Sequence, residues 1–234
     1  MASHTLETSI DFHISDQKTV GQQVYEELRQ RIVHGRLRPG QRLNEARIAQ
    51  DMGISRAPVR EAVQRLRQDG LVTTKPRHGP VVAEITAADA AHLYRLRSAL
   101  EELAVVLFIE RGAQGALKEL EDVVKAMIEA GQAGNLAQMV EQDVRFHEAL
   151  CEHSGNPLLS RIYQMISAQF RIAAIQDDAR TAELSEIARA HAELLETIGQ
   201  RDVSAAVSRL REHILSTLPN LVSRLNAQAA ERTP

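Results

Sequence analysis

Four side chains that can bind a divalent metal fall on apolar helical stripes in the second half of the 234-residue sequence: Asp143, His147, His191 and His213. Asp143 and His147 are spaced i and i+4, so on a helix both point to the same side. His191 and His213 each lie within the apolar stripe of another segment, so both imidazoles are expected to face inward. Because burying such groups costs free energy unless they are paired or bind a metal, the set fits a site for Zn²⁺, Ni²⁺ or Mn²⁺. The alternative is that each histidine only hydrogen-bonds a neighbour in the core.

A second candidate site lies within Leu37–Val82, where the sequence predicts a helix-turn-helix followed by a basic hairpin. A short helix is expected over Asn44–Met52, and Gly53 supplies the permissive backbone that ends it. The next helix is expected to begin after Ser55, a good N-cap residue, with Pro58 in its first turn. Its predicted buried stripe consists of Val59, Ala62, Val63 and Leu66.

Two arginines of this second helix, Arg56 and Arg60, fall outside the buried stripe. The first turns of a recognition helix enter the major groove of DNA, where Arg hydrogen-bonds guanine edges or phosphates. Two β-prone runs follow, 71–74 and 81–82, with basic residues between them, which is typical of the wing of a winged helix. The alternative is that these arginines only solvate a surface helix.

Charge is distributed unevenly along the chain. Residues 18–84 contain 13 Lys and Arg against 7 Asp and Glu, although the whole chain has a net charge of −3. Attraction to phosphate is therefore concentrated in the segment that contains the predicted recognition helix.

From Thr86 onward the sequence has helical periodicity, and no strand pattern follows Val82. Thr86 is a cap residue for the first of these helices, and Asn156 followed by Pro157 starts the fourth in a similar way. Five breaks delimit six predicted helices, at 112–115, 131–135, 155–157, 177–180 and 199–202. We predict a mainly α fold, with an N-terminal winged helix-turn-helix and a C-terminal all-helical antiparallel bundle.

The motifs PGQRLNE, IAQDMGISRAPVREAVQRLRQDGLV and PRHG resemble the DNA-binding domain of the GntR family of bacterial transcription regulators. The resemblance covers roughly residues 18–83. It implies that Arg56 and Arg60 are the recognition-helix arginines, and that His78 and Gly79 form the wing tip.

The first motif departs from the family pattern at one position. Members of the family often carry Arg directly after the Glu of this motif, whereas this chain has Ala46 there and Arg47 one place later. We retain Arg47 as a candidate DNA-binding residue, together with Ser55 at the start of the recognition helix.

The second half resembles the all-helical FCD effector domain of FadR-type members of the same family, over about Thr86–Leu221. The resemblance rests on YRLRSALE, on DVRFH, and on the positions of His191 and His213. It implies that the four candidate ligands hold a metal, and that this metal helps to bind a small carboxylate metabolite. The count of six helices favours the VanR-like subgroup.

Within YRLRSALE, Arg97 is the candidate partner of the effector carboxylate, because a guanidinium offers a bidentate pair of donors. Glu101 follows Arg97 at i+4. An ordinary ion pair between these two residues is therefore the alternative.

We predict a mobile N-terminal arm (1–17), a winged-helix DNA-binding domain (18–83) and an effector-binding and dimerisation domain (86–228). The single cysteine, Cys151, cannot form an internal disulfide and is expected to be buried. No apolar run approaches the roughly 20 residues that span a membrane. These features predict a cytoplasmic protein with no membrane partner.

The leading hypothesis is a ligand-responsive DNA-binding transcription regulator, acting as a repressor on a palindromic operator. A homodimer is expected, because two recognition helices can read two half-sites of double-stranded DNA. Its effector would be a small organic acid. A metal sensor, in which the metal itself is the signal, is one alternative.

A metal-dependent hydrolase is the other alternative. The HEXXH motif is absent, because His147 and Glu148 are followed by Ala149, Leu150 and Cys151. The sequence therefore predicts that the chain is not an enzyme.

Overall fold

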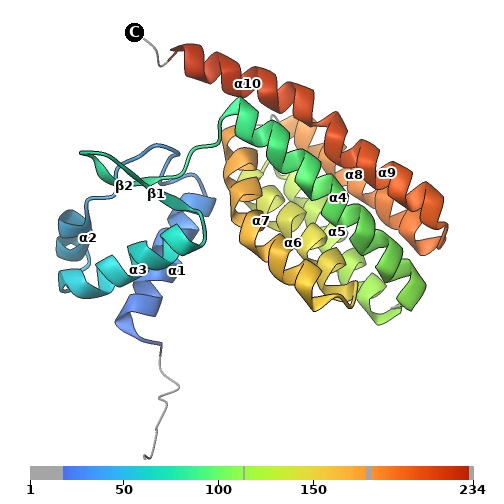
Figure 1. The fold of residues 1–234 in the computed structure, drawn as a ribbon, viewed down its shortest axis with the longest axis horizontal. Coiled ribbons are helices and arrows are strands. Elements are labelled where there is room, and N and C mark those ends of the chain that lie inside the picture. The colour runs from blue at the N-terminus through green and yellow to red at the C-terminus, as the bar shows by residue number, and fades with distance from the viewer. Residues whose placement is uncertain (1–17, 113, 178–180, 232–234) are drawn as a thin grey trace, which may run out of the picture.

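The computed structural model describes residues 18–112, 114–177 and 181–231, so the predicted N-terminal arm (1–17) lies outside the described residues. The fold is mainly α, as predicted. Figure 1 shows a small N-terminal unit beside a larger bundle of long helices, with α7 of the bundle on the side that faces the smaller unit.

The N-terminal unit is a helix-turn-helix with a two-stranded sheet. It consists of α1 (Val20–Val33), α2 (Glu45–Asp51), α3 (Arg56–Gln68), β1 (Val72–Lys75) and β2 (Gly79–Val82). Helix α1 packs against α3, and the predicted stripe on α3 is buried. A winged helix-turn-helix is therefore present where the sequence predicted it.

The hairpin is longer than the two β-prone runs indicated. Strands β1 and β2 pair antiparallel from Val72 opposite Val82 to Lys75 opposite Gly79. Pro80 lacks an N–H, but its carbonyl accepts a hydrogen bond from the backbone of Leu43 at 2.9 Å. Pro80 has a low intrinsic strand propensity, but its pairing with β1 on one side and with Leu43 on the other holds it in the sheet.

The larger unit is an antiparallel helical bundle, as predicted. Its helices are α4 (Ala87–Arg111), α5 (Gln114–Gln132), α6 (Leu136–His153), α7 (Pro157–Asp177), α8 (Thr181–Gly199), α9 (Val203–Ser216) and α10 (Leu218–Glu231). Helix α4 packs against α6, α7, α9 and α10, while α5 packs against α6 and α8. Helix α6 therefore lies in contact with both α4 and α5 in the interior of the bundle.

The predicted helix starts are confirmed at two positions. The Thr86 hydroxyl accepts from the backbone of Asp89, whose carboxylate accepts from the backbone of Thr86, so that α4 begins with a capping box. The Asn156 side chain accepts from the backbone of Leu158 at 3.1 Å and starts α7. These local bonds fix where both helices enter the bundle.

The prediction of six helices in this unit was wrong, because the described residues form seven. The segment expected as one final helix breaks between α9 and α10, at Thr217. Pro219 explains the break, since it has no N–H to continue the hydrogen-bond pattern of α9. The helix count therefore gives no support for the VanR-like subgroup.

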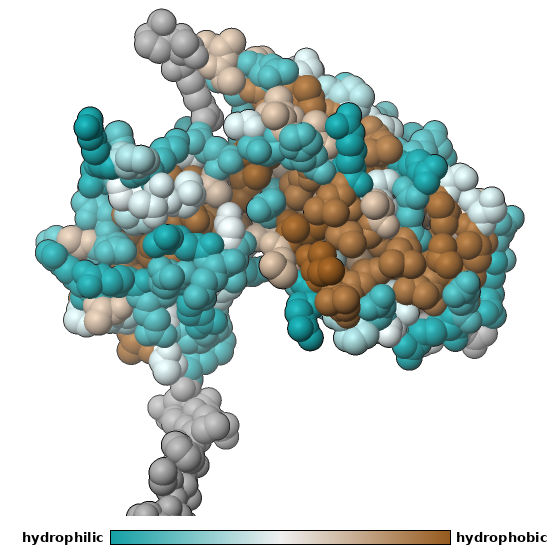
Figure 2. Space-filling model, viewed as in Figure 1, coloured by the Kyte–Doolittle hydropathy of each residue, from teal (hydrophilic) through white to brown (hydrophobic). Residues whose placement is uncertain are grey.

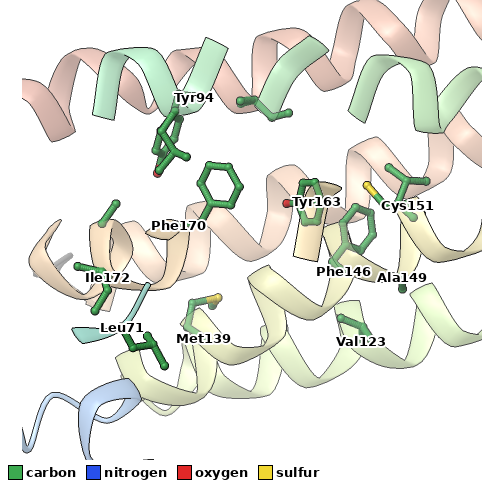
Figure 3. Packing of buried hydrophobic residues seen from close by; sticks show 14 of the residues in the cluster. Leu71, Tyr94, Val123, Met139, Phe146, Ala149, Cys151, Tyr163, Phe170 and Ile172 are labelled. Atoms are coloured by element: carbon green, nitrogen blue, oxygen red, sulfur yellow. The ribbon is translucent and has the colours of Figure 1, made fainter. Parts of the chain in front are cut away.

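Aromatic side chains pack along the inside of the bundle (Figure 3). Phe170 lies between Tyr94 and Tyr163, with ring centroids 6.1 Å and 5.8 Å apart, respectively. Cys151 is buried, as predicted, and this burial raises the pKa of its thiol. The thiol is therefore a packing group and not a reactive nucleophile.

The linker between the two units is held by α7. The backbone N–H of Ile85 donates to the Gln176 side-chain oxygen at 2.8 Å, and the Gln176 amide nitrogen donates back to the Ile85 carbonyl at 3.3 Å. None of the helices in the described ranges combines the length and apolar character that crossing a bilayer requires.

Candidate metal centre and nucleic-acid interface

The four predicted metal ligands converge at one point inside the bundle. Asp143 and His147 lie one turn apart on α6, His191 lies on α8, and His213 lies on α9. One ligand atom from each residue lies within 4.8 Å of those of the other three. The inward placement that periodicity predicted is therefore observed for all four side chains.

Two of the imidazoles direct Nε2 toward the centre of this cluster. His191 donates Nδ1–H to the backbone carbonyl of Ile187 at 2.8 Å, because a carbonyl can only accept. His147 contacts the carboxylate of Glu101 through Nδ1. Hydrogen bonds at Nδ1 that leave Nε2 available are the arrangement usual for metal-bound histidines.

The atoms that face one another in the cluster fit a bound cation. His191 Nε2 lies 3.1 Å from Asp143 Oδ1 and 3.2 Å from His147 Nε2. When both rings are neutral with the proton on Nδ1, three electron-rich atoms converge with no hydrogen between them. A divalent metal would relieve this repulsion, and three nitrogens with one carboxylate suit Zn²⁺, Ni²⁺ or Mn²⁺.

The electrostatic surroundings favour the protonation states that metal binding requires. Burial lowers the pKa of His147, and the charge of Arg97 lowers it further. Burial also holds the pKa of His213 well below its usual range, with a further contribution from His191. For Asp143, burial opposes ionisation, but contact with His191 and the charge of Arg97 outweigh it and lower the pKa. Neutral imidazoles and an ionised carboxylate are the metal-binding forms.

Arg97 makes the ion pair that the sequence offered as the alternative to effector binding. Its Nε donates to Glu101 at 2.7 Å, and one of its terminal nitrogens lies 3.9 Å from the Asp143 carboxylate. The guanidinium also lies 4.9 Å from the centroid of the Phe170 ring. These contacts hold Arg97 beside the metal ligands, and its side chain also lines the adjacent cavity.

A cavity of about 390 Å³ opens beside the cluster. Arg97, Asp143 and His213 form part of its wall, and apolar side chains of α6 and α8 form another part. The junction of α9 and α10 contributes the polar residues Ser216, Thr217 and Asn220. A larger groove of about 580 Å³ lies between α5 and α8, but none of the four ligands lines it. The smaller cavity is therefore the candidate ligand site.

Sequence reasoning missed two parts of this site. Glu101 was considered only as a partner of Arg97, although it also contacts His147 from another helix. The polar junction at Thr217 was missed because the last helix was expected to be continuous. Pro219 was the signal that could have located this junction.

In the N-terminal unit, the predicted DNA-binding side chains are exposed. Ser55, Arg56 and Arg60 lie at the start of α3, and Arg47 lies on α2. Arg60 lies 3.9 Å from Glu45, a weak contact for an exposed pair. By contrast, Arg65 lies inward, 4.3 Å from the centroid of the Tyr25 ring.

Ser55 differs from the predicted N-cap in one respect. Its backbone has the extended conformation of an N-cap residue, but its hydroxyl caps no backbone N–H. Pro58 occupies the third helical position and has no N–H to donate, which removes one of the two usual partners. The Ser55 hydroxyl is therefore not committed to capping α3.

The wing tip is a tight turn that exposes His78. Arg77 adopts a φ of 64° and Gly79 a φ of 74°, both in the left-handed region. His78 donates Nδ1–H to the Pro76 carbonyl at 3.0 Å, which orients its ring. Gly79 suits this conformation because it has no Cβ, whereas Arg77 adopts it at an energetic cost.

Two family models match the chain. The model of bacterial regulatory proteins of the gntR family matches residues 20–82, and the FCD domain model matches residues 92–216. The first match covers the winged helix-turn-helix, and the second contains all four candidate metal ligands and Arg97.

Individual proteins resemble this chain over different fractions of its length. The chain is 29% identical to the HTH-type transcriptional regulator YdhC of Bacillus subtilis over 210 residues, which cover 88% of this chain and 91% of YdhC. It is 34% identical to the Nta operon transcriptional regulator of Aminobacter aminovorans over 136 residues, 58% of this chain and 64% of that protein. The solved structure of Escherichia coli McbR/YncC has a TM-score of 0.74 at 24% identity, covering 91% of this chain and all of that one (100%), and thus shares the fold.

Proposed function

This chain belongs to the gntR family of bacterial regulatory proteins and carries an FCD domain, and we propose that it represses transcription until a small carboxylate metabolite releases it from DNA. It is a transcription regulator with an effector-binding domain. We further propose that it acts in the cytoplasm as a homodimer on a palindromic operator. The observation that carries the proposal is a four-ligand cluster with two members, Asp143 and His213, in the wall of a cavity, in the same chain as a helix-turn-helix with exposed arginines.

The proposed effector site combines the cluster with the cavity beside it. Asp143, His147, His191 and His213 would hold the metal, whose positive charge would attract one oxygen of the effector carboxylate. Arg97, whose terminal nitrogen lies 3.9 Å from the Asp143 carboxylate, would add a second positive charge in the cavity wall that attracts the effector carboxylate. The apolar wall would accept the carbon skeleton of the metabolite, and the polar junction of α9 and α10 would bind its other polar groups.

Release of DNA requires a path from this site to the N-terminal unit. Helix α6 carries Asp143 and His147 and packs against α7. Helix α7 in turn holds the linker at Ile85 through Gln176. An effector can shift the protein toward release only if it binds the released arrangement more tightly than the DNA-bound one.

The proposed dimer interface is an apolar surface formed by α4 and α7. It contains the exposed side chains of Leu96, Leu103, Leu158, Ile162 and Met165. Figure 2 shows a brown, apolar area over the face where α4 and α7 lie in Figure 1. A contiguous apolar patch of this kind marks an interaction site. A second copy of the chain is the occupant that would also supply the second recognition helix for a palindrome.

DNA binding by the purified protein tests the regulatory part of the proposal. We expect a marked preference for the DNA upstream of its own gene over random DNA at physiological salt, because base contacts add to the phosphate attraction. One small carboxylate from a panel should weaken this binding and raise the melting temperature of the metal-loaded protein. Equal affinity for both DNAs would contradict the proposal.

A metal sensor is the second candidate, because the same cluster could itself receive the signal. The two roles differ in how DNA affinity responds to free metal. A sensor predicts that operator affinity follows the metal concentration without any organic acid. A metal that anchors an effector predicts that the protein retains the metal throughout and that only the acid changes operator affinity.

A further inference from the structure

A buried carboxylate lies directly behind the metal cluster and was not among the predicted ligands. Glu101, on α4, is fully buried and accepts hydrogen bonds from three side chains. Arg97 Nε lies 2.7 Å and the Tyr163 hydroxyl 2.9 Å from the same oxygen, Oε1. His147 Nδ1 contacts the other oxygen, Oε2. Glu101 thus joins a cavity-lining arginine to a metal-ligand candidate.

The direction of the His147 bond follows from the ion pair of Glu101 with Arg97. A carboxylate paired with a guanidinium is ionised and can only accept, so His147 must donate from Nδ1. In a neutral imidazole the second nitrogen is then unprotonated. His147 Nε2, which lies 3.2 Å from His191 Nε2 within the cluster, therefore has the lone pair that a metal requires.

We propose that Glu101 is a positioning residue of the metal centre, which holds His147 in the tautomer that presents Nε2 to the metal. The inference rests on the proposed metal site and adds a residue to it. Glu101 also affects the metal centre through its ion pair with Arg97. That ion pair limits the attraction of Arg97 for Asp143 and leaves Asp143 Oδ1 facing His191 at 3.1 Å.

The competing explanation is that Glu101 only neutralises a buried arginine. Glu101→Gln separates the two roles, because glutamine has the same shape but a single oxygen. Arg97 and Tyr163 both donate to Oε1, so the Gln oxygen is best placed there and the amide nitrogen must face His147. An amide nitrogen donates, so His147 Nδ1 would have to accept, and its proton would move to Nε2. That proton would point at the metal position.

The experiment uses the full-length protein and compares wild type with Glu101→Gln and Tyr163→Phe. Zn²⁺ affinity is measured by competition with a chromophoric chelator, and ¹⁵N chemical shifts of the metal-free protein identify which ring nitrogen of His147 carries the proton. We expect Glu101→Gln to lose about 10- to 100-fold in Zn²⁺ affinity and to move the proton to Nε2. Tyr163→Phe removes another bond to the same carboxylate and should retain the wild-type tautomer, with an affinity close to that of wild type.

The outcomes separate this proposal from the proposed function. Wild type that binds Zn²⁺ with a proton on His147 Nδ1, together with a weakened Glu101→Gln variant, supports the positioning role. If Glu101→Gln keeps wild-type Zn²⁺ affinity, the positioning role is overturned and the metal site stands. If wild type binds none of Zn²⁺, Ni²⁺ and Mn²⁺ in the same competition assay, both the positioning role and the proposed metal site are overturned. Should Glu101→Gln fail to fold, the wild-type tautomer still decides: a proton on Nε2 overturns the proposal.

Discussion

The side-chain amide of Gln176 hydrogen-bonds both backbone polar groups of Ile85, with its oxygen 2.8 Å from the N–H donor and its nitrogen 3.3 Å from the carbonyl acceptor. Both residues are buried. The segment that joins the DNA-binding unit to the bundle is therefore fastened to α7 by one side chain. A linker held in this way can transmit a movement of α7 to the N-terminal unit.

Replacing Gln176 by Ala should destabilise the protein. The substitution leaves a buried N–H and a buried carbonyl of Ile85 without partners, which costs about 1–3 kcal/mol for each group left unsatisfied. We expect a lower free energy of unfolding in urea. Gln164→Ala, an exposed position on the same helix, is the matched control and should change stability by less than about 0.5 kcal/mol. Equal stabilities for the two variants would show that the linker is not fastened in this way.

Two N-cap residues of the helix-turn-helix should respond differently to Ala. Asn44 accepts from the backbone of Ala46 and Arg47 at 3.1 and 3.2 Å, so Asn44→Ala should cost about 1 kcal/mol in thermal or urea unfolding. Ser55 caps no N–H, so Ser55→Ala should leave stability nearly unchanged. Weaker operator binding by Ser55→Ala at unchanged stability would then report a lost DNA contact. A Ser55→Ala variant as unstable as Asn44→Ala would contradict the structure.

The sequence was sufficient to locate the four metal-ligand candidates for a physical reason. Helical periodicity fixes which side chains on one helix face inward, and an imidazole or carboxylate on an apolar stripe is conspicuous because burial is costly. Asp143 and His147 could therefore be paired from their spacing alone. His191 and His213 lie on two other helices, and their approach to Asp143 and His147 depends on how the three helices pack. The inward direction of each of these two histidines therefore had to be inferred from its own helix.

The features that were missed depend on contacts between elements distant in sequence. Glu101 and His147 lie on different helices, so no local pattern shows that they meet. The cavity wall at Thr217 follows from a helix break that the apolar periodicity concealed. The residue type of Ser55 correctly predicted a helix start. Its side-chain capping bond is absent because Pro58, three residues later, has no N–H to donate.

Tyr25 should make stability fall at high pH. Burial, and then the hydrogen bond to Asp69 at 2.6 Å, raises the pKa of Tyr25 from 10.0 to about 12. Since the folded-state pKa exceeds the unfolded value, this contribution is complete below pH 10 and is lost as the pH rises toward 12. Tyr25 is only partly buried, so we expect an effect of about 1 kcal/mol. The free energy of unfolding, measured with denaturant across this pH range, should fall less steeply for Tyr25→Phe than for wild type. Parallel curves for the two proteins would show that Tyr25 does not contribute to the pH dependence.

Arg56 should contribute to DNA binding without contributing to the fold. The side chain is exposed at the first position of α3, and it makes no ion pair within the described part of the chain. Arg56→Ala should therefore weaken operator binding by about 1–3 kcal/mol if it reads a base, and reduce the salt dependence of binding if it contacts a phosphate. Arg95→Ala removes the same charge from an exposed position on α4 and is the control. Operator titrations at several salt concentrations that fail to separate the two variants would remove Arg56 from the interface.

The apolar surface of α4 and α7 should control self-association. Met165 is its most exposed member, with 70% of its surface accessible. A two-fold interface contains every substitution twice, so Met165→Glu would bury two carboxylates in an apolar contact and should shift sedimentation toward the monomer. Ile128→Glu introduces the same change at an exposed apolar position on α5, outside this surface, and should leave the assembly intact.

The same pair of variants connects assembly to DNA recognition. A monomer retains the contacts of one recognition helix but loses the second half-site, so Met165→Glu should weaken binding to the full operator by roughly 10-fold or more. Binding to a DNA fragment with a single half-site should be equal for both variants, because neither substitution touches the winged helix. If Met165→Glu remains dimeric and binds the full operator as tightly as wild type, the interface lies elsewhere on the molecule. If both variants lose half-site binding, the effect arises from unfolding and not from the interface.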